Sequence, residues 1–343
     1  MKEAIKRIEW VDALKGVAII WLMIYHFYIV EWLRSPVFIF FFLSGLFYSS
    51  DSSFATFLKK KARVLLIPFL FFFVLGLIVS YFGTVAIGKK FVFPHVWQLL
   101  TLIPVEAEVH NPLGVGAIWF LVSLFEIYVF YYLIRLLSTN KIFILIFTGL
   151  LWLFASFILE KFAMGSLVYM ICSLSFLPFF VVAHLFREHV LNKQNPLWVI
   201  GVAIVVYLFT LIPISESIIK PTFLRGLDVM GGGIILRIKD LIGSSALIII
   251  LIEIAKRVGE KIKNHCRYVN RFLVYEGGNS LIILGVHFLL QPILFHAIKL
   301  LFGDMINAVL LYFLLFVLEL IFCNICICLF SRYIPFFVNK KYK

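Results

Sequence analysis

Residues 7–27 read RIEWVDALKGVAIIWLMIYHF, an apolar stretch that carries an aspartate, a lysine and a histidine where a plain membrane anchor would carry none. Successive residues of a helix rotate by about 100°, so Lys15 and His26, eleven positions apart, lie about 20° apart on one face. Asp12 lies one turn before Lys15, on nearly the same face. Because Asp and Lys at the centre of a bilayer each cost roughly 2.5–3.5 kcal/mol on insertion scales, such groups usually mark a functional site.

The composition of the whole chain sets its class. Hydrophobic residues make up 63% of the 343 residues, charged residues make up 14%, and the mean hydropathy is +1.06. This composition excludes a soluble domain and predicts an all-α, polytopic membrane protein. We predict one transmembrane domain over residues 1–343, without a separate soluble domain, and about ten spans, at roughly 11–33, 36–50, 64–84, 117–136, 142–160, 163–186, 197–214, 241–256, 279–301 and 305–330.

Basic residues predict the orientation of these spans, because cytosolic loops carry an excess of Lys and Arg. With the N-terminus inside, the cytosolic segments hold 21 Lys and Arg, and the opposite side with its margins holds nine. We therefore predict that both termini and the 257–275 loop are cytosolic, and that the segments 85–116 and 215–240 face outward. The net charge of +13 then belongs mainly to loops that face anionic lipid, and it requires no nucleic acid. The basic clusters at 59–63 and 256–271 are either topology determinants or a binding site for a phosphate-rich cytosolic ligand such as coenzyme A.

Two intramembrane histidines are candidate catalytic residues. His26 is either a general base, because imidazole accepts a proton near neutral pH, or a core histidine that bridges two helices. Its shared face with Asp12 and Lys15 favours the catalytic interpretation. His287 lies about nine residues into its predicted span, and it either completes the site or stabilises a kink at Pro292. Lys15 is either an electrostatic anchor for substrate or only the ion-pair partner of Asp12.

Other polar residues within the predicted spans need an explanation. Glu126 and Glu319 lie at membrane depth and need partners, either the histidines or water. The pattern Cys323-x-x-Cys326-x-Cys328 has the spacing of a metal site, but no histidine lies near it in the sequence. We therefore expect no metal, and no nucleotide-binding or hydrolase motif is present.

Several stretches, taken in order along the chain, resemble acyltransferase family 3, a family of membrane O-acyltransferases, and within it the fucose-4-O-acetylase-like branch. The resemblance covers nearly the whole chain and rests on Trp10–Gly16 followed by His26, Phe40–Gly45, Lys60–Phe69, Ile118–Leu121, and Gly278–Leu281 followed by His287. It implies a multi-pass enzyme of the plasma (inner) membrane. Such an enzyme moves an acetyl or other short acyl group from cytosolic acyl-CoA to a hydroxyl of a cell-surface or lipid-linked glycan, with no metal.

The resemblance also implies roles for individual residues. The family's arginine, followed by ten residues and a histidine, corresponds here to Lys15 and His26, so lysine replaces arginine and the planar fork of the guanidinium is lost. The family's basic pair before the proline of the third span corresponds imperfectly to Lys60 and Arg63. The implied catalytic residues are His26, Asp12 and His287, the implied donor-binding residues are Lys15, Arg63 and Lys60, and the implied supporting residues are Ser44, Trp119, Glu126 and Asn279.

Two mechanisms fit an enzyme that joins a cytosolic donor to an acceptor completed on the far side of the membrane. His26 either removes the proton of the sugar hydroxyl as this oxygen attacks the thioester, or it carries the acyl group in a covalent intermediate. The competing class is a transporter or flippase that uses the same ionisable residues as a relay. Transporters often show paired, similarly interrupted halves, and no internal repeat is detectable here.

Overall fold

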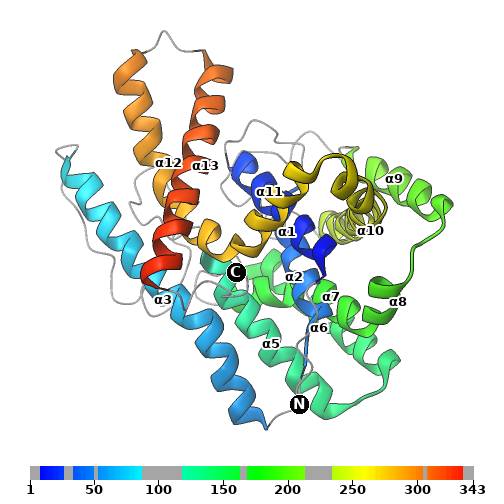
Figure 1. The fold of residues 1–343 in the computed structure, drawn as a ribbon. Helices are drawn as coiled ribbons and strands as arrows, with labels where there is room; N and C mark the ends of the chain where they lie inside the picture. The colour runs from blue at the N-terminus through cyan, green and yellow to red at the C-terminus, as the bar shows by residue number, and fades with distance from the viewer. Residues whose placement is uncertain are drawn as a thin grey trace.

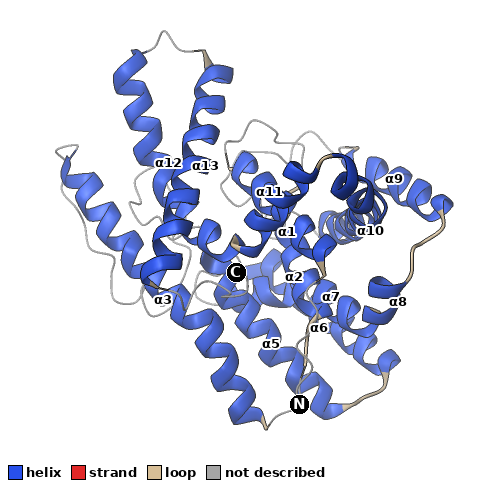
Figure 2. Ribbon diagram, viewed as in Figure 1, coloured by secondary structure: helices blue, strands red, loops and turns tan. Residues whose placement is uncertain are grey.

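The computed structural model describes residues 8–26, 34–49, 53–86, 118–162, 168–212, 234–303 and 307–334. All regular structure in these residues is helical, which confirms the predicted all-α class for them (Figures 1 and 2). The predicted outward segments 85–116 and 215–240 lie largely outside the described residues. The helices are α1 (Glu9–Tyr25), α2 (Val37–Leu46), α3 (Phe54–Ala86), α5 (Trp119–Leu137), α6 (Lys141–Phe162), α7 (Val168–Leu185), α8 (Arg187–Asn192), α9 (Leu197–Leu211), α10 (Ile234–His265), α11 (Arg267–Gly278), α12 (Ser280–Phe302) and α13 (Ala308–Tyr333).

Several of these helices have the length and apolar character of membrane spans. Three qualify singly, namely α3 over Phe54–Gly83, α5 and α13. A fourth candidate is a bent pair, in which Arg267–Gly278 and Ser280–Leu289 meet at 77°. These helices support a membrane protein, while the predicted number of ten spans and the orientation with both termini inside remain predictions.

Some predicted elements differ from the observed ones. The span predicted at 36–50 contains α2, whose ten residues reach only about 15 Å, half of the roughly 30 Å hydrocarbon core. The segment 257–275 is not a loop as predicted, because α10 continues to His265 and α11 begins at Arg267. Its predicted cytosolic location stays a prediction. The sequence of α11 is too polar to predict a span, and its helix is stabilised by packing against α1.

The helices surround α1, which packs most extensively against α11 and also against α2, α10 and α12 (Figure 1). On one side α2 packs against α7 through phenylalanine rings, and the ring centroids of Phe41 and Phe176 are 4.6 Å apart. α12 and α13 lie side by side at the upper left of Figure 1, and α9 packs against α10 at the right. Asn140 and Asn307 begin α6 and α13 as N-caps, because the side-chain oxygen of each accepts a hydrogen bond from a backbone N–H of the first turn.

The contact between α1 and α11 is a crossing of two backbones. A Cβ atom built on Gly277 would lie 1.8 Å from the carbonyl oxygen of Asp12, and one built on Gly16 would lie 2.0 Å from the carbonyl oxygen of Leu273. Neither position therefore has room for any side chain. Near the start of both helices, the Asn270 amide also donates a hydrogen bond of 2.6 Å to the Glu9 carboxylate.

The chain turns sharply directly after this crossing. Asn279 separates α11 from α12, and its side-chain amide donates a 2.8 Å hydrogen bond to the carbonyl of Tyr275 in the last turn of α11. This bond satisfies a carbonyl that the end of the helix leaves without a partner. The bend of 77° then directs α12 along α1, toward the C-terminal end of α1.

We expect Gly277→Ala to destabilise the protein, because the new methyl group forces the α11 backbone away from Asp12. Overpacking of this kind costs about 1–3 kcal/mol. Gly201→Ala in α9 is the matched control, because a Cβ there meets nothing within 4 Å and alanine favours a helix by about 0.5–1 kcal/mol over glycine. Thermal unfolding of the purified variants in detergent measures both changes, and an equal midpoint for the two variants would contradict the crossing.

Candidate functional site

Two histidines meet where α1 ends and α12 passes it. His26 is the C-cap residue of α1, and His287 lies in the first half of α12. The Nδ1 atom of His26 is 3.1 Å from the Nε2 atom of His287, and the two ring planes are 28° apart. His287 is fully buried, whereas His26 is partly exposed. The fold thus brings together two candidate catalytic residues that lie 261 positions apart in the sequence.

Hydrogen bonding decides which nitrogen of each neutral ring carries the proton. The Nδ1 atom of His287 is 2.8 Å from the carbonyl oxygen of Ile283. A carbonyl can only accept, so Nδ1 of His287 holds the proton and its Nε2 carries a lone pair. That lone pair accepts the hydrogen bond from Nδ1–H of His26. The Nε2 atom of His26 is therefore left with a lone pair, which is the arrangement of a general base held by a buried partner.

Neighbouring side chains position the ring of His26. The Gln291 amide donates a 3.2 Å hydrogen bond to the backbone carbonyl of His26, which satisfies one of the carbonyls left free at the end of α1. The ring of Phe288 packs edge-on against His26, with centroids 5.5 Å apart. The sequence interpretation assigned no role to Gln291, although it lies four residues after His287 and hence on the same helical face.

The polar stripe predicted on α1 exists, but its members lie at opposite ends of the helix. Asp12 is buried, and its carboxylate is 3.8 Å from the ammonium of Lys15. Lys15 and His26 are eleven residues apart, about 17 Å along the axis at 1.5 Å per residue. The structure therefore brings His287 to His26, but it does not bring Asp12 or Lys15 there.

The basic residues proposed for donor binding lie in the N-terminal turns of α3. Lys60 and Arg63 are exposed, so both are accessible to a ligand. Lys61 between them is half-buried instead, and its ammonium lies 3.4 Å from the ring centroid of Tyr128 in α5. This cation–π contact fixes the rotation of α3 against α5, which directs Lys60 and Arg63 outward.

The predicted supporting residues serve the packing of helices in this structure. Ser44 donates a 2.7 Å hydrogen bond to the carbonyl of Phe40 one turn earlier, and Trp119 packs against phenylalanine rings of α2 and α7. Glu126 accepts a 2.6 Å hydrogen bond from Ser173. The partner of Glu126 is thus a serine of α7, and neither of the two expected partners, a histidine or water, supplies this bond. Asn279 forms the bend before α12.

The cysteine pattern does not gather metal ligands. Cys323 is buried in α13, Cys326 is half-buried and Cys328 is exposed, so the three side chains face in different directions. Within the described ranges, no group of three or more His, Cys, Asp or Glu side chains is arranged to hold a metal ion. Glu319 is also buried in α13, and its Oε2 atom has no hydrogen-bond partner among the described residues.

A comparison with protein families assigns the chain to a class. A family model described as an acyltransferase domain, that of acyltransferase family 3, matches residues 8–328. The match spans most of the 343 residues, so the chain belongs to this family. The protein is thus a membrane acyltransferase. No curated protein and no solved structure matches the chain significantly.

The hydrogen bonds of the histidine pair predict that His26 and His287 differ in reactivity toward diethyl pyrocarbonate, a reagent that modifies unprotonated imidazole nitrogen. We expect His26 to react, because its Nε2 lone pair has no hydrogen-bond donor in the pair, and His287 to be protected by burial. In His26→Ala, His287 should become reactive, while the exposed His189 should react equally in both proteins. Peptide mass spectrometry measures the modification at each site, and faster reaction at His287 than at His26 in the unchanged protein would contradict this order.

Proposed function

We propose that this acyltransferase moves an acetyl or other short acyl group from cytosolic acyl-CoA to a hydroxyl of a cell-surface or lipid-linked glycan. The observation that carries the proposal is the His26–His287 pair, because it leaves a lone pair on Nε2 of a partly exposed histidine. A sugar hydroxyl is a weak nucleophile at neutral pH and needs such a base. The fucose-4-O-acetylase-like branch remains our proposal for the closer relationship, on the motifs described above.

The proposed reaction replaces the carbon–sulfur bond of the thioester with a carbon–oxygen bond to the sugar and moves one proton from the sugar to CoA. Nε2 of His26 accepts the hydroxyl proton while the sugar oxygen forms a bond to the thioester carbonyl carbon. The carbon–sulfur bond then breaks, and the proton returns to the departing CoA sulfur. In the alternative mechanism Nε2 of His26 attacks the thioester first and carries the acyl group to the sugar. In both mechanisms His287 is a positioning residue, because it contacts His26 and fixes its tautomer.

The donor is proposed to bind at the end of the molecule where α3 begins. Lys60 and Arg63 present two cations there, and phosphates of CoA are anionic, so attraction is favourable. Lys15 lies near the N-terminal end of α1, the end opposite His26. Lys15 is therefore proposed to attract the donor rather than to act on the reacting atoms. No metal enters the proposed reaction.

The proposed setting is the plasma (inner) membrane, with both termini in the cytosol. The excess of Lys and Arg in the segments assigned to the cytosol supports this orientation. A base deep in the bilayer suits a donor on one side and an acceptor on the other. The alternative of a transporter or flippase has no supporting contact in the described residues, and the family assignment disfavours it.

We expect His26→Gln to lower acyl transfer by about 10²–10⁴-fold, because glutamine keeps a hydrogen-bonding group but cannot act as a base near neutral pH. His287→Gln should lose less activity than His287→Ala, because the amide oxygen can still accept the bond from His26. His189→Gln, at an exposed site, is the control. The measurement is incorporation of labelled acetyl from acetyl-CoA into glycan by membranes with equal amounts of each variant. Near-full activity of His26→Gln would contradict the assignment of the base.

We expect Arg63→Ala to raise the KM for acyl-CoA more than it lowers kcat, because a contact to the CoA phosphates is kept from the ground state to the transition state. Lys141→Ala, which removes an exposed cation at the start of α6, is the matched control for net charge. Steady-state kinetics with varied acyl-CoA separates the two constants. An unchanged KM in Arg63→Ala would remove Arg63 from the donor site.

A further inference from the structure

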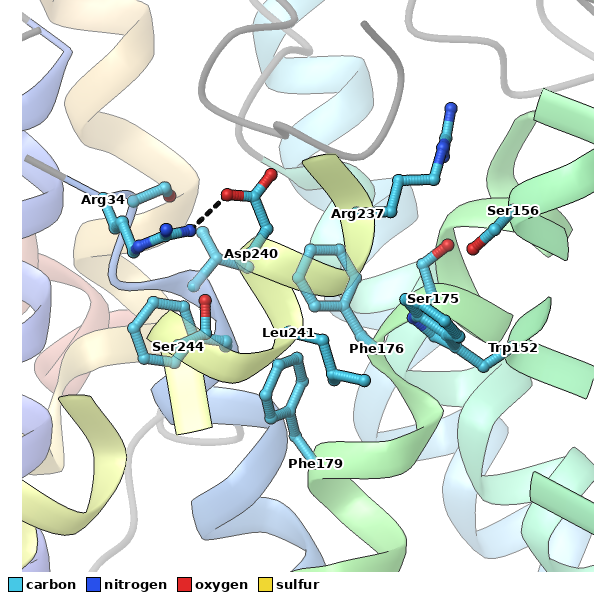
Figure 3. A pocket seen from close by; sticks show the side chains of 13 residues that line it. Arg34, Trp152, Ser156, Ser175, Phe176, Phe179, Arg237, Asp240, Leu241 and Ser244 are labelled. Carbon is cyan, nitrogen blue, oxygen red and sulfur yellow. Dashed lines mark hydrogen bonds and ion pairs between the residues drawn. The ribbon is translucent and has the colours of Figure 1, made fainter. Parts of the chain in front are cut away.

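A second polar site lies apart from the histidines, between α2, α6, α7 and α10. It is a pocket of about 60 Å³, shown in Figure 3. Two arginines and one aspartate line it, together with serine hydroxyls and aromatic rings. None of the residues proposed above for base catalysis or donor binding lines this pocket, so neither role accounts for it.

The described lining of the pocket carries more positive than negative groups. Arg34 forms an ion pair with Asp240, and Arg237 is the second cation in the lining. The two arginines are 8% and 4% exposed, so both side chains are buried beside the cavity. Among the described residues that line the pocket, two guanidinium groups and one carboxylate sum to a net charge of +1. The pocket therefore favours an anion.

The pocket also contains hydrogen-bond donors without an acceptor. Ser156 in α6 is 1% exposed, and its hydroxyl has no hydrogen-bond partner among the described residues. The Nε atom of Arg34 likewise has no partner among them. Figure 3 shows the hydroxyls of Ser156 and Ser175 turned toward each other from α6 and α7, on the side of the pocket where Arg237 lies. Buried polar groups are nearly always paired, so an unpaired donor beside a cavity points to a ligand that accepts hydrogen bonds.

The helices place these groups by simple spacing. Arg237, Asp240 and Ser244 recur at three and four positions along α10 and therefore share one face. Trp152 and Ser156 are four residues apart on α6, so the indole lies one turn from the hydroxyl. The pocket is thus formed by aligned faces of regular helices, which hold its groups in fixed positions.

We propose that this pocket binds an oxyanion, namely a carboxylate or phosphate group carried by a sugar or by a lipid headgroup. Guanidinium groups match the planar carboxylate and the phosphate oxygens, and hydroxyl donors complete the shell of such an anion. A cavity needs about 10–15 Å³ to hold one water molecule. The pocket of about 60 Å³ therefore has room for about four to six oxygen-sized atoms, which is enough for a phosphate group. The rest of the ligand then lies outside the pocket.

The test is a binding titration that does not depend on acyl transfer. The full-length protein is placed in nanodiscs of zwitterionic phosphatidylcholine, whose choline cation balances its phosphate and which is the common baseline of every arm. Its thermal unfolding midpoint is followed as glucuronate, glucose 1-phosphate or glucose is added. A second arm replaces part of the lipid with phosphatidylglycerol. We expect saturable stabilisation by at least one anion and none by glucose. Stabilisation by the sugar anions identifies a sugar as the carrier, and stabilisation by phosphatidylglycerol alone identifies a lipid.

Variants link the binding to the pocket. Arg237→Gln should weaken binding about 10-fold or more, as expected for a lost charge-assisted hydrogen bond, and Arg267→Gln at an exposed site should not. Ser156→Ala should weaken binding about 2–10-fold without lowering the stability of the free protein, because its hydroxyl is unpaired there. Thr148→Val is its matched control, since Thr148 carries another buried, unpaired hydroxyl on α6 but does not line the pocket.

The result that would overturn the proposal is the absence of stabilisation by every anion, or equal stabilisation of Ser156→Ala, Arg237→Gln and the unchanged protein. Because the readout is unfolding rather than acetyl incorporation, such a failure would leave the proposed role of His26 intact. Loss of activity in His26→Gln with intact anion binding would likewise separate the two sites.

Discussion

The site depends on the crossing of α1 and α11 at Gly16 and Gly277, where two backbones touch. α11 can lie this close to α1 only because neither position carries a side chain. The 77° bend at Asn279 follows directly, so the crossing fixes the point from which α12 starts. Any shift of α11 would move α12 with it and separate His287 from His26. The contact on which the histidine pair depends thus lies away from the two histidine rings.

A chain of hydrogen bonds determines which nitrogen of each histidine ring carries the proton. It runs from the Ile283 carbonyl through the two ring nitrogens of His287 to Nδ1 of His26, and it leaves a lone pair on Nε2 of His26. A buried histidine in the second position performs the orienting role that a carboxylate has in many catalytic sites. The pair therefore holds His26 in a fixed tautomer without burying a carboxylate beside it, which would add a charge at membrane depth.

Buried polar groups elsewhere follow a similar rule of local pairing. Glu253 in α10 is fully buried and is 3.5 Å from both Lys256 and Arg257, while Asn195 donates a hydrogen bond to it. The charge of Glu253 is thus balanced by cations of its own helix, although its Oε2 atom has no hydrogen-bond partner among the described residues. The pocket beside Arg34 and Ser156 differs, because its Ser156 hydroxyl and Arg34 Nε lie beside a cavity and have no hydrogen-bond partner among the described residues. This contrast separates a structural cluster from a candidate binding site.

The sequence by itself determined the helical membrane class and pointed to His26 and His287, because apolar length and ionisable groups at membrane depth are local properties of the chain. It also predicted that Asp12 and Lys15 share a face, since that follows from helical rotation. It did not predict that α11 is a helix, that Gln291 bonds to His26, or that Arg34 meets Asp240, 206 positions away. Those outcomes depend on which helices touch, and only the tertiary structure decided them, because glycine contacts and interhelical hydrogen bonds join residues that no periodicity relates.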